Sequence, residues 1–180
     1  MTILVKQHET GIEEYDRLFG QPTHDNQILF ELSIVAVFQA GLSWQVAASK
    51  LPVFRQVFAN FDYQQVAGFD EPEFEALLQN PAMIRNPRKI QAIIMNARAI
   101  YQLQPEFKDF ADYLWHFSEN QTWTMAVPIG APLNRRSSFG AIVAKDMKKR
   151  GFKFLGPTTV QLLLLACGII QRQETDETEA

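Results

Sequence analysis

Gln39-Ala40-Gly41-Leu42-Ser43-Trp44 is the stretch that decides how the helices of this chain are joined. Before it, apolar residues in the range 28–36 recur every three or four positions, which is the spacing of an amphipathic helix, and Asp25 is placed to cap its N-terminus. Gly41 is expected to end that helix, and Ser43 is expected to cap the next one. The stretch therefore predicts a sharp corner between two helices.

Helical spacing continues along most of the remaining chain. Pro52 is expected to kink or split the helix that follows the corner, and Asp70 with Glu73 resembles a capping box. Residues 121–136 are interpreted as a long irregular loop because they contain two prolines and a glycine. The expected helices cover residues 25–40, 43–61, 70–80, 90–101, 107–117, 141–150 and 157–167. No stretch alternates clearly enough to favour a strand, so the predicted fold class is all-α.

Length and composition indicate one domain. The chain has 180 residues, of which 47% are hydrophobic and 21% charged, as is typical of a globular domain with a single core. We assign residues 1–180 to that domain and expect about 171–180 to form a frayed acidic tail. The longest apolar run, residues 160–167, is far below the ~20 residues of a membrane span, and residues 1–6 lack the long apolar core of a secretory signal. A cytoplasmic location is expected.

The single cysteine, Cys167, limits the covalent chemistry of the chain. One cysteine excludes an internal disulfide and leaves too few sulfur ligands for a structural zinc site of the usual kind. Its place in an apolar helical stripe predicts a buried side chain.

Basic residues gather in two segments although the net charge is −3, from 17 basic and 20 acidic residues. The first segment contains Arg85, Arg88 and Lys89 at the start of a strong helix, where unpaired backbone N–H groups and positive side chains suit a phosphate. An ordinary helical turn with solvated charges is the alternative. The second segment consists of Lys145, Lys148, Lys149, Arg150 and Lys153. It suits a polyanion, or else it is a solvated helix end with cations at its negative pole.

The corner itself has two interpretations. In an enzyme that extracts a base from DNA, Leu42 can enter the base stack while Trp44 stacks on the extruded base. In any other helical protein the same residues are two caps and two core side chains. His8, His24 and His116 are scattered, and no metalloprotease or serine-triad pattern accompanies them. Glu13 and Glu14 are expected by default on a solvated surface.

These segments occur in an order and spacing that resemble the 3-methyladenine DNA glycosylase I family, from about Leu18 to Ile170. The matching blocks are residues 19–22, 29–31, 39–44, 84–86, 89–90, 96–99, 148–154 and Gly156. The resemblance implies a helix-hairpin-helix fold and, in base-excision repair, the removal of a positively charged methylated adenine from duplex DNA. It also implies a monomer whose partner is that DNA.

Site residues follow from the resemblance position by position. Trp44 and Phe19 are expected as pocket aromatics, with Tyr15 beside them and Phe38 making the pocket more apolar and smaller. Gly41 and Leu42 are expected to form the wedge at the lesion. The residues expected to lie along the DNA backbone are Arg85, Lys89, Lys148, Lys149, Arg150 and Lys153.

The chain departs from the family at its carboxylate. Ala36 stands where the family has a base-contacting glutamate, so Glu14, Glu13 or Glu31 is expected to supply a replacement, and Glu14 is put forward as the catalytic residue. Loss of a carboxylate contact to a cation removes about 2–4 kcal/mol of transition-state stabilisation. An acid that substitutes for it has to lie within reach of Trp44.

The zinc-binding positions also depart from the family. Tyr15, Gln173 and Glu177 stand where its zinc-binding histidines and a cysteine are expected, so no structural zinc and no other cofactor is expected. Two functions remain open: a glycosylase, or a DNA-binding relative that has lost base excision. A helical protein without any DNA role would require the two basic segments to lie on opposite faces.

Overall fold

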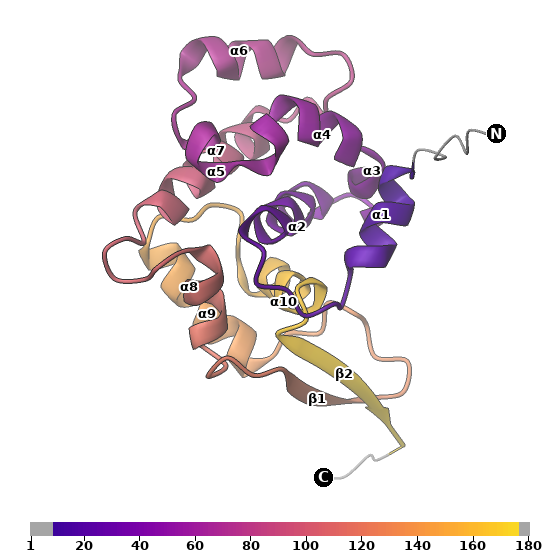
Figure 1. Cartoon of the computed structure of the whole chain (residues 1–180). Helices are drawn as coiled ribbons and strands as arrows, with labels where there is room; N and C mark the ends of the chain where they lie inside the picture. The colour runs from indigo at the N-terminus through magenta and orange to yellow at the C-terminus, as the bar shows by residue number, and fades with distance from the viewer. Residues whose placement is uncertain (1–8, 177–180) are drawn as a thin grey trace, which may run out of the picture.

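The computed structural model describes residues 9–176, and helices dominate this part of the chain, so the predicted all-α class is confirmed (Figure 1). The helices are α1 (Gly11–Leu18), α2 (Asn26–Gln39), α3 (Trp44–Ser49), α4 (Leu51–Val57), a 3-10 turn η1 (Ala59–Phe61), α5 (Tyr63–Ala67), α6 (Glu71–Gln79), α7 (Pro87–Tyr101), α8 (Phe110–His116), α9 (Ser138–Lys149) and α10 (Pro157–Ala166). Two strands, β1 (Trp123–Pro128) and β2 (Ile170–Thr175), complete the described elements.

Helix α2 lies at the centre of the helical body, with α3, α7, α8 and α10 packed around it (Figure 1). All ten residues from Leu29 to Phe38 are buried, which corrects the expectation of an amphipathic helix. A helix that is apolar on every side is stable only where neighbours cover all of it. The buried apolar side chains form one continuous cluster around α2. The C-terminal end of this helix, which leads into the corner at 39–44, is therefore packed into the core.

Helix boundaries agree with the local rules that predicted them. The Asp25 carboxylate accepts hydrogen bonds from the backbone N–H groups of Gln27 and Ile28, at 2.9 and 3.1 Å. Ser43 caps α3 by accepting from the Val46 N–H at 3.2 Å. The helix after the corner is split at Lys50, one residue before the helix that contains Pro52 begins. The predicted corner between α2 and α3 is therefore confirmed.

Helix α1 was not expected, because its residues were interpreted as a solvated, turn-rich segment. A capping box between Thr10 and Glu13 starts the helix, which packs against α3 through Gly11 beside Ala48 and Tyr15 beside Trp44. Glu13 is thereby committed to the helix terminus, where its carboxylate accepts from the Thr10 N–H at 2.8 Å. The helix brings Tyr15 and Phe19 toward the corner.

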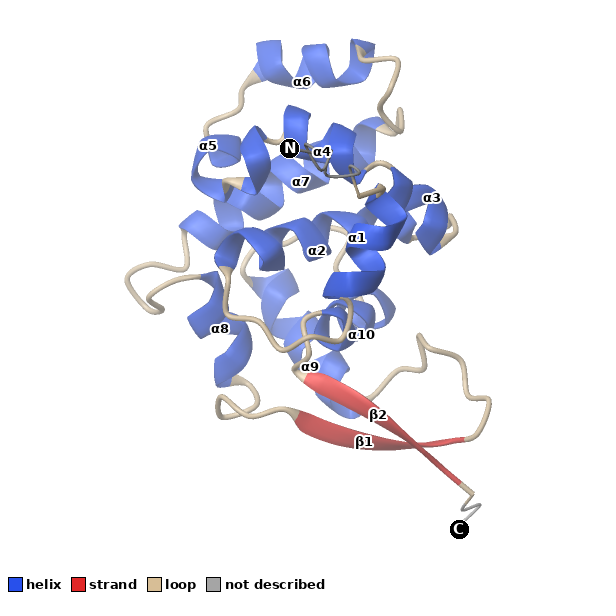
Figure 2. Ribbon diagram, turned by 45° about the vertical axis from the view of Figure 1, so that its right-hand side comes forward, coloured by secondary structure: helices blue, strands red, loops and turns tan. Residues whose placement is uncertain are grey.

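The two strands correct part of the predicted loop at 121–136 and the predicted fraying of residues 171–175, while residues 177–180 of the expected tail lie outside the described residues. β1 and β2 pair in parallel, with Trp123 opposite Ile170 and Pro128 opposite Thr175, and they lie at one end of the helical body (Figure 2). Arg172 adds a hydrogen bond of 2.7 Å to the Ala131 carbonyl oxygen. The two strands are far apart in sequence, and neither has the alternation of buried and exposed residues that is typical of a sheet face. No local pattern in the sequence therefore indicated them.

Within residues 9–176, no helix is long and apolar enough to cross a membrane. The predicted burial of Cys167 is confirmed, since its side chain is fully enclosed at the end of α10.

Candidate functional site

A cavity of about 260 Å³ opens beside the corner between α2 and α3. Tyr15 and Phe19 form one wall, and their rings meet edge to face with centroids 5.6 Å apart. Trp44 lies on the other side, with its centroid 5.8 Å from that of Tyr15. The six lining residues are Tyr15, Asp16, Phe19, Gln39, Trp44 and Leu133. The structure thus brings three of the predicted pocket aromatics together from α1, the loop after it and α3.

The polar groups of the cavity are a phenol, an amide and a carboxylate. Burial raises the pKa of the Tyr15 phenol, and the charge of Asp16 raises it further, so this hydroxyl stays neutral at physiological pH. The Oε1 atom of Gln39 is buried and has no hydrogen-bond partner among the described residues. Asp16 stands exposed at the rim. The cavity therefore offers hydrogen-bond acceptors and ring faces, which suit a flat ligand that carries positive charge.

Phe38 does not line this cavity, which corrects its prediction as a pocket residue. Its side chain is fully buried and stacks on Phe54 with centroids 4.8 Å apart. Ala36 is 2% exposed and precedes Gln39 by three residues, so it lies on the same side of α2, one turn below the cavity wall. The Phe38 side chain therefore fills the core and does not narrow the cavity.

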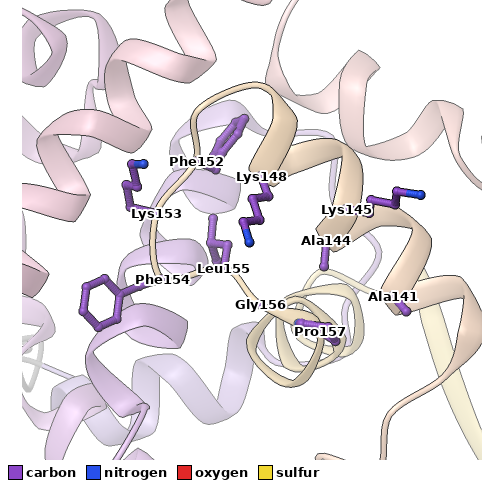
Figure 3. A pocket seen from close by; sticks show the side chains of 10 residues that line it. All are labelled: Ala141, Ala144, Lys145, Lys148, Phe152, Lys153, Phe154, Leu155, Gly156 and Pro157. Atoms are coloured by element: carbon purple, nitrogen blue, oxygen red, sulfur yellow. The ribbon is translucent and has the colours of Figure 1, made fainter.

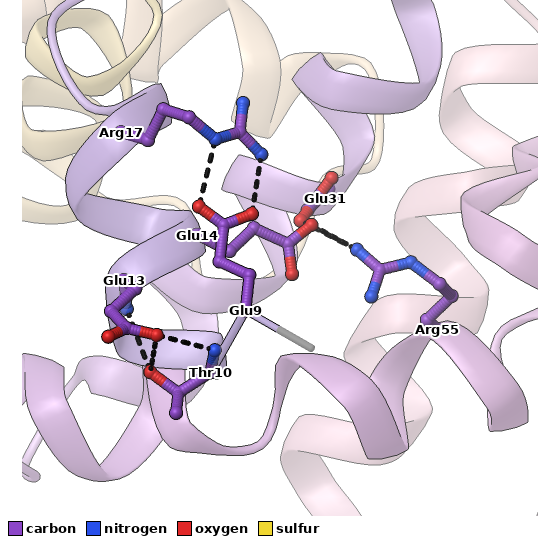
Figure 4. Close-up of polar contacts among 7 residues, drawn as sticks. All are labelled: Glu9, Thr10, Glu13, Glu14, Arg17, Glu31 and Arg55. Atoms are coloured by element: carbon purple, nitrogen blue, oxygen red, sulfur yellow. Dashed lines mark hydrogen bonds and ion pairs between the residues drawn. The ribbon is translucent and has the colours of Figure 1, made fainter. Parts of the chain in front are cut away.

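Glu14 and Glu31, two of the proposed substitute acids, form a cluster with Arg55 instead of lining the cavity (Figure 4). Glu14 pairs directly with the Arg55 guanidinium, and the nearest oxygen of Glu31 lies 3.5 Å from it. Burial, together with the negative charge of Glu14, raises the pKa of Glu31 to about 8. At neutral pH one carboxylate thus balances one guanidinium, and Glu31 is mostly protonated. The prediction of Glu14 as the catalytic acid is corrected, because its charge is committed to Arg55.

Lys89, on α7, holds the corner by contacts with the end of α2. Its ammonium group donates a 2.9 Å hydrogen bond to the Phe38 carbonyl oxygen and another to that of Ala40, and burial lowers its pKa. The prediction that Lys89 contacts the DNA backbone is corrected, since this side chain is buried and its donors face the end of α2. Leu42, at the tip of the corner, is 43% exposed. Gly41 beside it has φ +79°, a left-handed conformation that glycine adopts without strain.

The two basic segments meet at Lys153. Arg88 at the start of α7 and Lys153 line the same hollow, of about 500 Å³. Lys153 also borders a second hollow, again of about 500 Å³, together with Lys145 and Lys148 of α9 (Figure 3). Asn96 of α7 fixes this junction, because its side-chain amide accepts from the Lys153 N–H at 2.7 Å and donates to the Lys153 carbonyl oxygen at 3.0 Å. Lys148 is exposed, and so are Arg85 and Lys149, which line neither hollow.

Arg150 is the exception within the second basic segment. Its guanidinium donates to both carboxylate oxygens of Glu106, at 2.8 and 2.9 Å, and to Asp146 at 2.7 Å. It also lies over the rings of Phe107 and Tyr113, 5.1 and 5.3 Å from their centroids. The prediction of a DNA-backbone contact from Arg150 is corrected to a structural role.

Sequence reasoning did not single out Asp16, Gln39 or Leu133 as lining residues. Tyr15 and Phe19 have the i, i+4 spacing of neighbours on a helix, and recognition of α1 as a helix would have placed Asp16 beside them. Leu133 comes from the segment between β1 and α9, whose path depends on the unpredicted strand pairing.

The chain matches the methyladenine glycosylase family model over residues 4–178. It belongs to this family. It is 36% identical to DNA-3-methyladenine glycosylase 1 of Escherichia coli over 166 residues, covering 92% of this chain and 89% of the relative. A solved structure of 3-methyladenine DNA glycosylase I has a TM-score of 0.80 at 35% identity, with 91% of each chain covered. A variant of such an enzyme in complex with 3-methyladenine has a TM-score of 0.81 at 26% identity, covering 91% of this chain and 88% of that one.

Proposed function

We propose that this protein is a DNA glycosylase that hydrolyses the N-glycosidic bond of 3-methyladenine or a related alkylated base in duplex DNA. The observation that carries the proposal is the cavity in which Tyr15, Phe19 and Trp44 meet, next to the exposed corner at Leu42. Its aromatic walls and acceptor groups suit a cationic purine. The named relatives, DNA-3-methyladenine glycosylases, support the same substrate class.

Breaking the bond between the sugar and a cationic base needs little proton transfer by the protein. An N-methylated adenine in DNA carries a positive charge, so the base departs readily once it is extruded and held. Ring faces stabilise a cation while it is bound, and exclusion of bulk water strengthens each electrostatic contact. Trp44 and Phe19 hold the base, Leu42 enters the gap it leaves, and water attacks the sugar carbon as the bond to the base breaks.

The face that holds the DNA is assigned to the exposed basic side chains. Arg85 and Arg88 lie at the N-terminus of α7, and Lys148, Lys149 and Lys153 lie at the junction of α9 and α10. Lys89, which anchors the corner, joins this face to the cavity. Phosphate contacts position the duplex, and its affinity should fall steeply with salt.

The test is release of labelled 3-methyladenine from methylated duplex DNA by the purified protein, alongside Trp44→Ala and Trp123→Ala. Trp44 lines the cavity, whereas Trp123 is an exposed tryptophan on β1 that packs against Phe139. Loss of a stacking surface should lower the single-turnover rate of Trp44→Ala by about 10- to 100-fold. Trp123→Ala should keep the native rate, and equal losses in both variants would contradict the assignment of the cavity.

A second function is favoured by the missing glutamate. Ala36 offers no carboxylate, and Glu14 and Glu31 lie with Arg55, so a DNA-binding relative without base excision is the alternative. Binding to an abasic-site duplex without base release, with release restored by Ala36→Glu, would establish it. Release by the native protein would establish the glycosylase.

We further propose that the protein works as a cytoplasmic monomer without the structural zinc of its family. Tyr15, at one expected ligand position, has its phenol buried in the cavity wall with a raised pKa, and Gln173 lies on β2 opposite Ala126. Neither is a zinc donor of the usual kind, and Glu177 falls outside the described residues. Pairing of β1 with β2 holds the C-terminal segment instead. Elemental analysis should find no zinc, and a chelator should leave the stability unchanged.

A further inference from the structure

The cavity wall contains one carboxylate among its six lining residues, that of Asp16. The neighbouring cation on α1, Arg17, is paired with Glu9 through two hydrogen bonds of 2.9 and 3.0 Å. Arg55 of α4, a helix that contacts α1, pairs with Glu14 and lies 3.5 Å from Glu31. Both guanidinium groups therefore pair with other acids, so neither neutralises the Asp16 carboxylate, which can interact with a ligand in the cavity.

Asp16 is also an acid that its own helix does not favour. It lies in the last turn of α1, where the backbone carbonyl groups give the helix its negative pole. The N-terminal turn of the same helix holds Glu13 and Glu14, where acids are favourable. A carboxylate at the opposite end adds nothing to helix stability, so its position needs another explanation.

Two neutral polar side chains line the same cavity. They are Tyr15, whose hydroxyl stays neutral, and Gln39 of α2, whose buried Oε1 atom has no hydrogen-bond partner among the described residues. An extruded alkylated adenine brings an amino group and a positive charge. The Asp16 carboxylate would serve the positive charge, and a neutral acceptor such as the Tyr15 hydroxyl oxygen would serve the amino group. A neutral adenine would use only the second of these contacts.

We infer that Asp16 faces the cationic base and supplies the negative charge that position 36 lacks. The inference rests on the proposed function. Asp16 lies at an exposed rim, where water screens its charge, and an extruded base under a covering duplex would displace that water. Asp16 is thus a specificity-determining residue whose effect grows when DNA is bound, and it needs no proton transfer.

Two small probes isolate the charge: 3,9-dimethyladeninium, a permanent cation with the ring system of the alkylated base, and neutral 9-methyladenine. Their affinities for the full-length protein are measured by tryptophan fluorescence, for the native protein, Asp16→Asn and Asp16→Glu. Glu75→Gln is the matched control, since it removes an exposed acid on α6. Without a covering duplex, Asp16→Asn should lower the preference for the cation by roughly two- to fivefold, whereas Asp16→Glu and Glu75→Gln should keep it.

The same variants are then assayed on DNA. Asp16→Asn should release 3-methyladenine from methylated duplex about tenfold more slowly in a single turnover, with its affinity for an abasic-site duplex within about twofold of native. Unchanged preference and unchanged rate in Asp16→Asn would overturn the inference while leaving the glycosylase intact. A native protein that neither releases the base nor prefers the cation would overturn the proposed function and the inference with it. The melting temperature of each variant shows that it is folded.

Discussion

The ammonium nitrogen of Lys89 lies 2.9 Å from the carbonyl oxygen of Phe38, across 51 residues of sequence. This contact joins the first turn of α7 to the last turn of α2. The carbonyl groups at the end of a helix have no partner within it, and here Lys89 supplies one for Phe38 and one for Ala40. The corner before Leu42 is therefore held from the same helix that presents Arg88 to solvent.

Lys89→Met should destabilise the fold by about 1–3 kcal/mol, because it leaves the buried carbonyl oxygen of Phe38 without a donor. Arg88→Met, one residue earlier and exposed, should leave stability unchanged but weaken DNA binding. Urea unfolding and the salt dependence of DNA affinity separate the two effects. If Lys89→Met kept native stability and lost a phosphate contact, the structural role assigned to Lys89 would be wrong.

The Glu14–Glu31–Arg55 cluster predicts a specific pH dependence of stability. The pKa of Glu31 is raised to about 8 in the folded protein, above its unfolded value, so the folded state binds more protons. Its contribution is fully present below the unfolded pKa and is lost as pH rises through the folded one. Native stability should therefore decline between about pH 5 and pH 8 relative to Glu31→Gln.

The measurement is the free energy of unfolding in urea at a series of pH values. The free energy of unfolding of Glu31→Gln, relative to that of the native protein, should rise by on the order of 2 kcal/mol between pH 5 and pH 8.5. Glu75→Gln, with the same chemical change at an exposed site, should run parallel to native. Parallel curves for all three proteins would show that Glu31 ionises normally.

Arg150 and Lys148 are two residues apart, yet their variants should behave differently. Arg150 holds Glu106 and Asp146, so Arg150→Met should lower stability while the salt dependence of DNA binding stays native. Lys148 is exposed beside the hollow at α10, and Lys148→Met should reduce the slope of log affinity against log salt by about 1. A reduced slope for Arg150→Met would return Arg150 to the DNA-binding residues.

The sequence predicted a structural feature where the contacts that determine it lie within a few residues of one another. The corner follows from Asp25, Gly41 and Ser43, each of which acts on backbone groups within a few residues, and all three were predicted. Phe19 and Trp44 were identified as pocket residues through the family resemblance, and they do meet at one cavity.

Contacts between distant segments were beyond local patterns. Lys89 has the sequence context of a solvent-exposed cation, and only the packing of α7 on α2 buries it. Phe38 could fill either the pocket or the core, and Phe54 decides for the core by stacking on it. Glu14 pairs with Arg55, 41 residues later, so this ion pair had no signal in the local sequence.

Leu42 is placed to enter the base stack, since it is 43% exposed at a corner whose backbone is anchored from beneath. Leu42→Ala should lower the single-turnover release of 3-methyladenine by about tenfold, because a smaller side chain stabilises the gap in the stack less well. Val46→Ala is the control, since Val46 on α3 is 46% exposed and is also an aliphatic side chain truncated to alanine. Fluorescence of 2-aminopurine placed beside an abasic site reports insertion directly. An unchanged signal and rate for Leu42→Ala would mean that another side chain fills the gap, whereas a selective loss for Leu42 over Val46 ties the exposed tip of the corner to base extrusion.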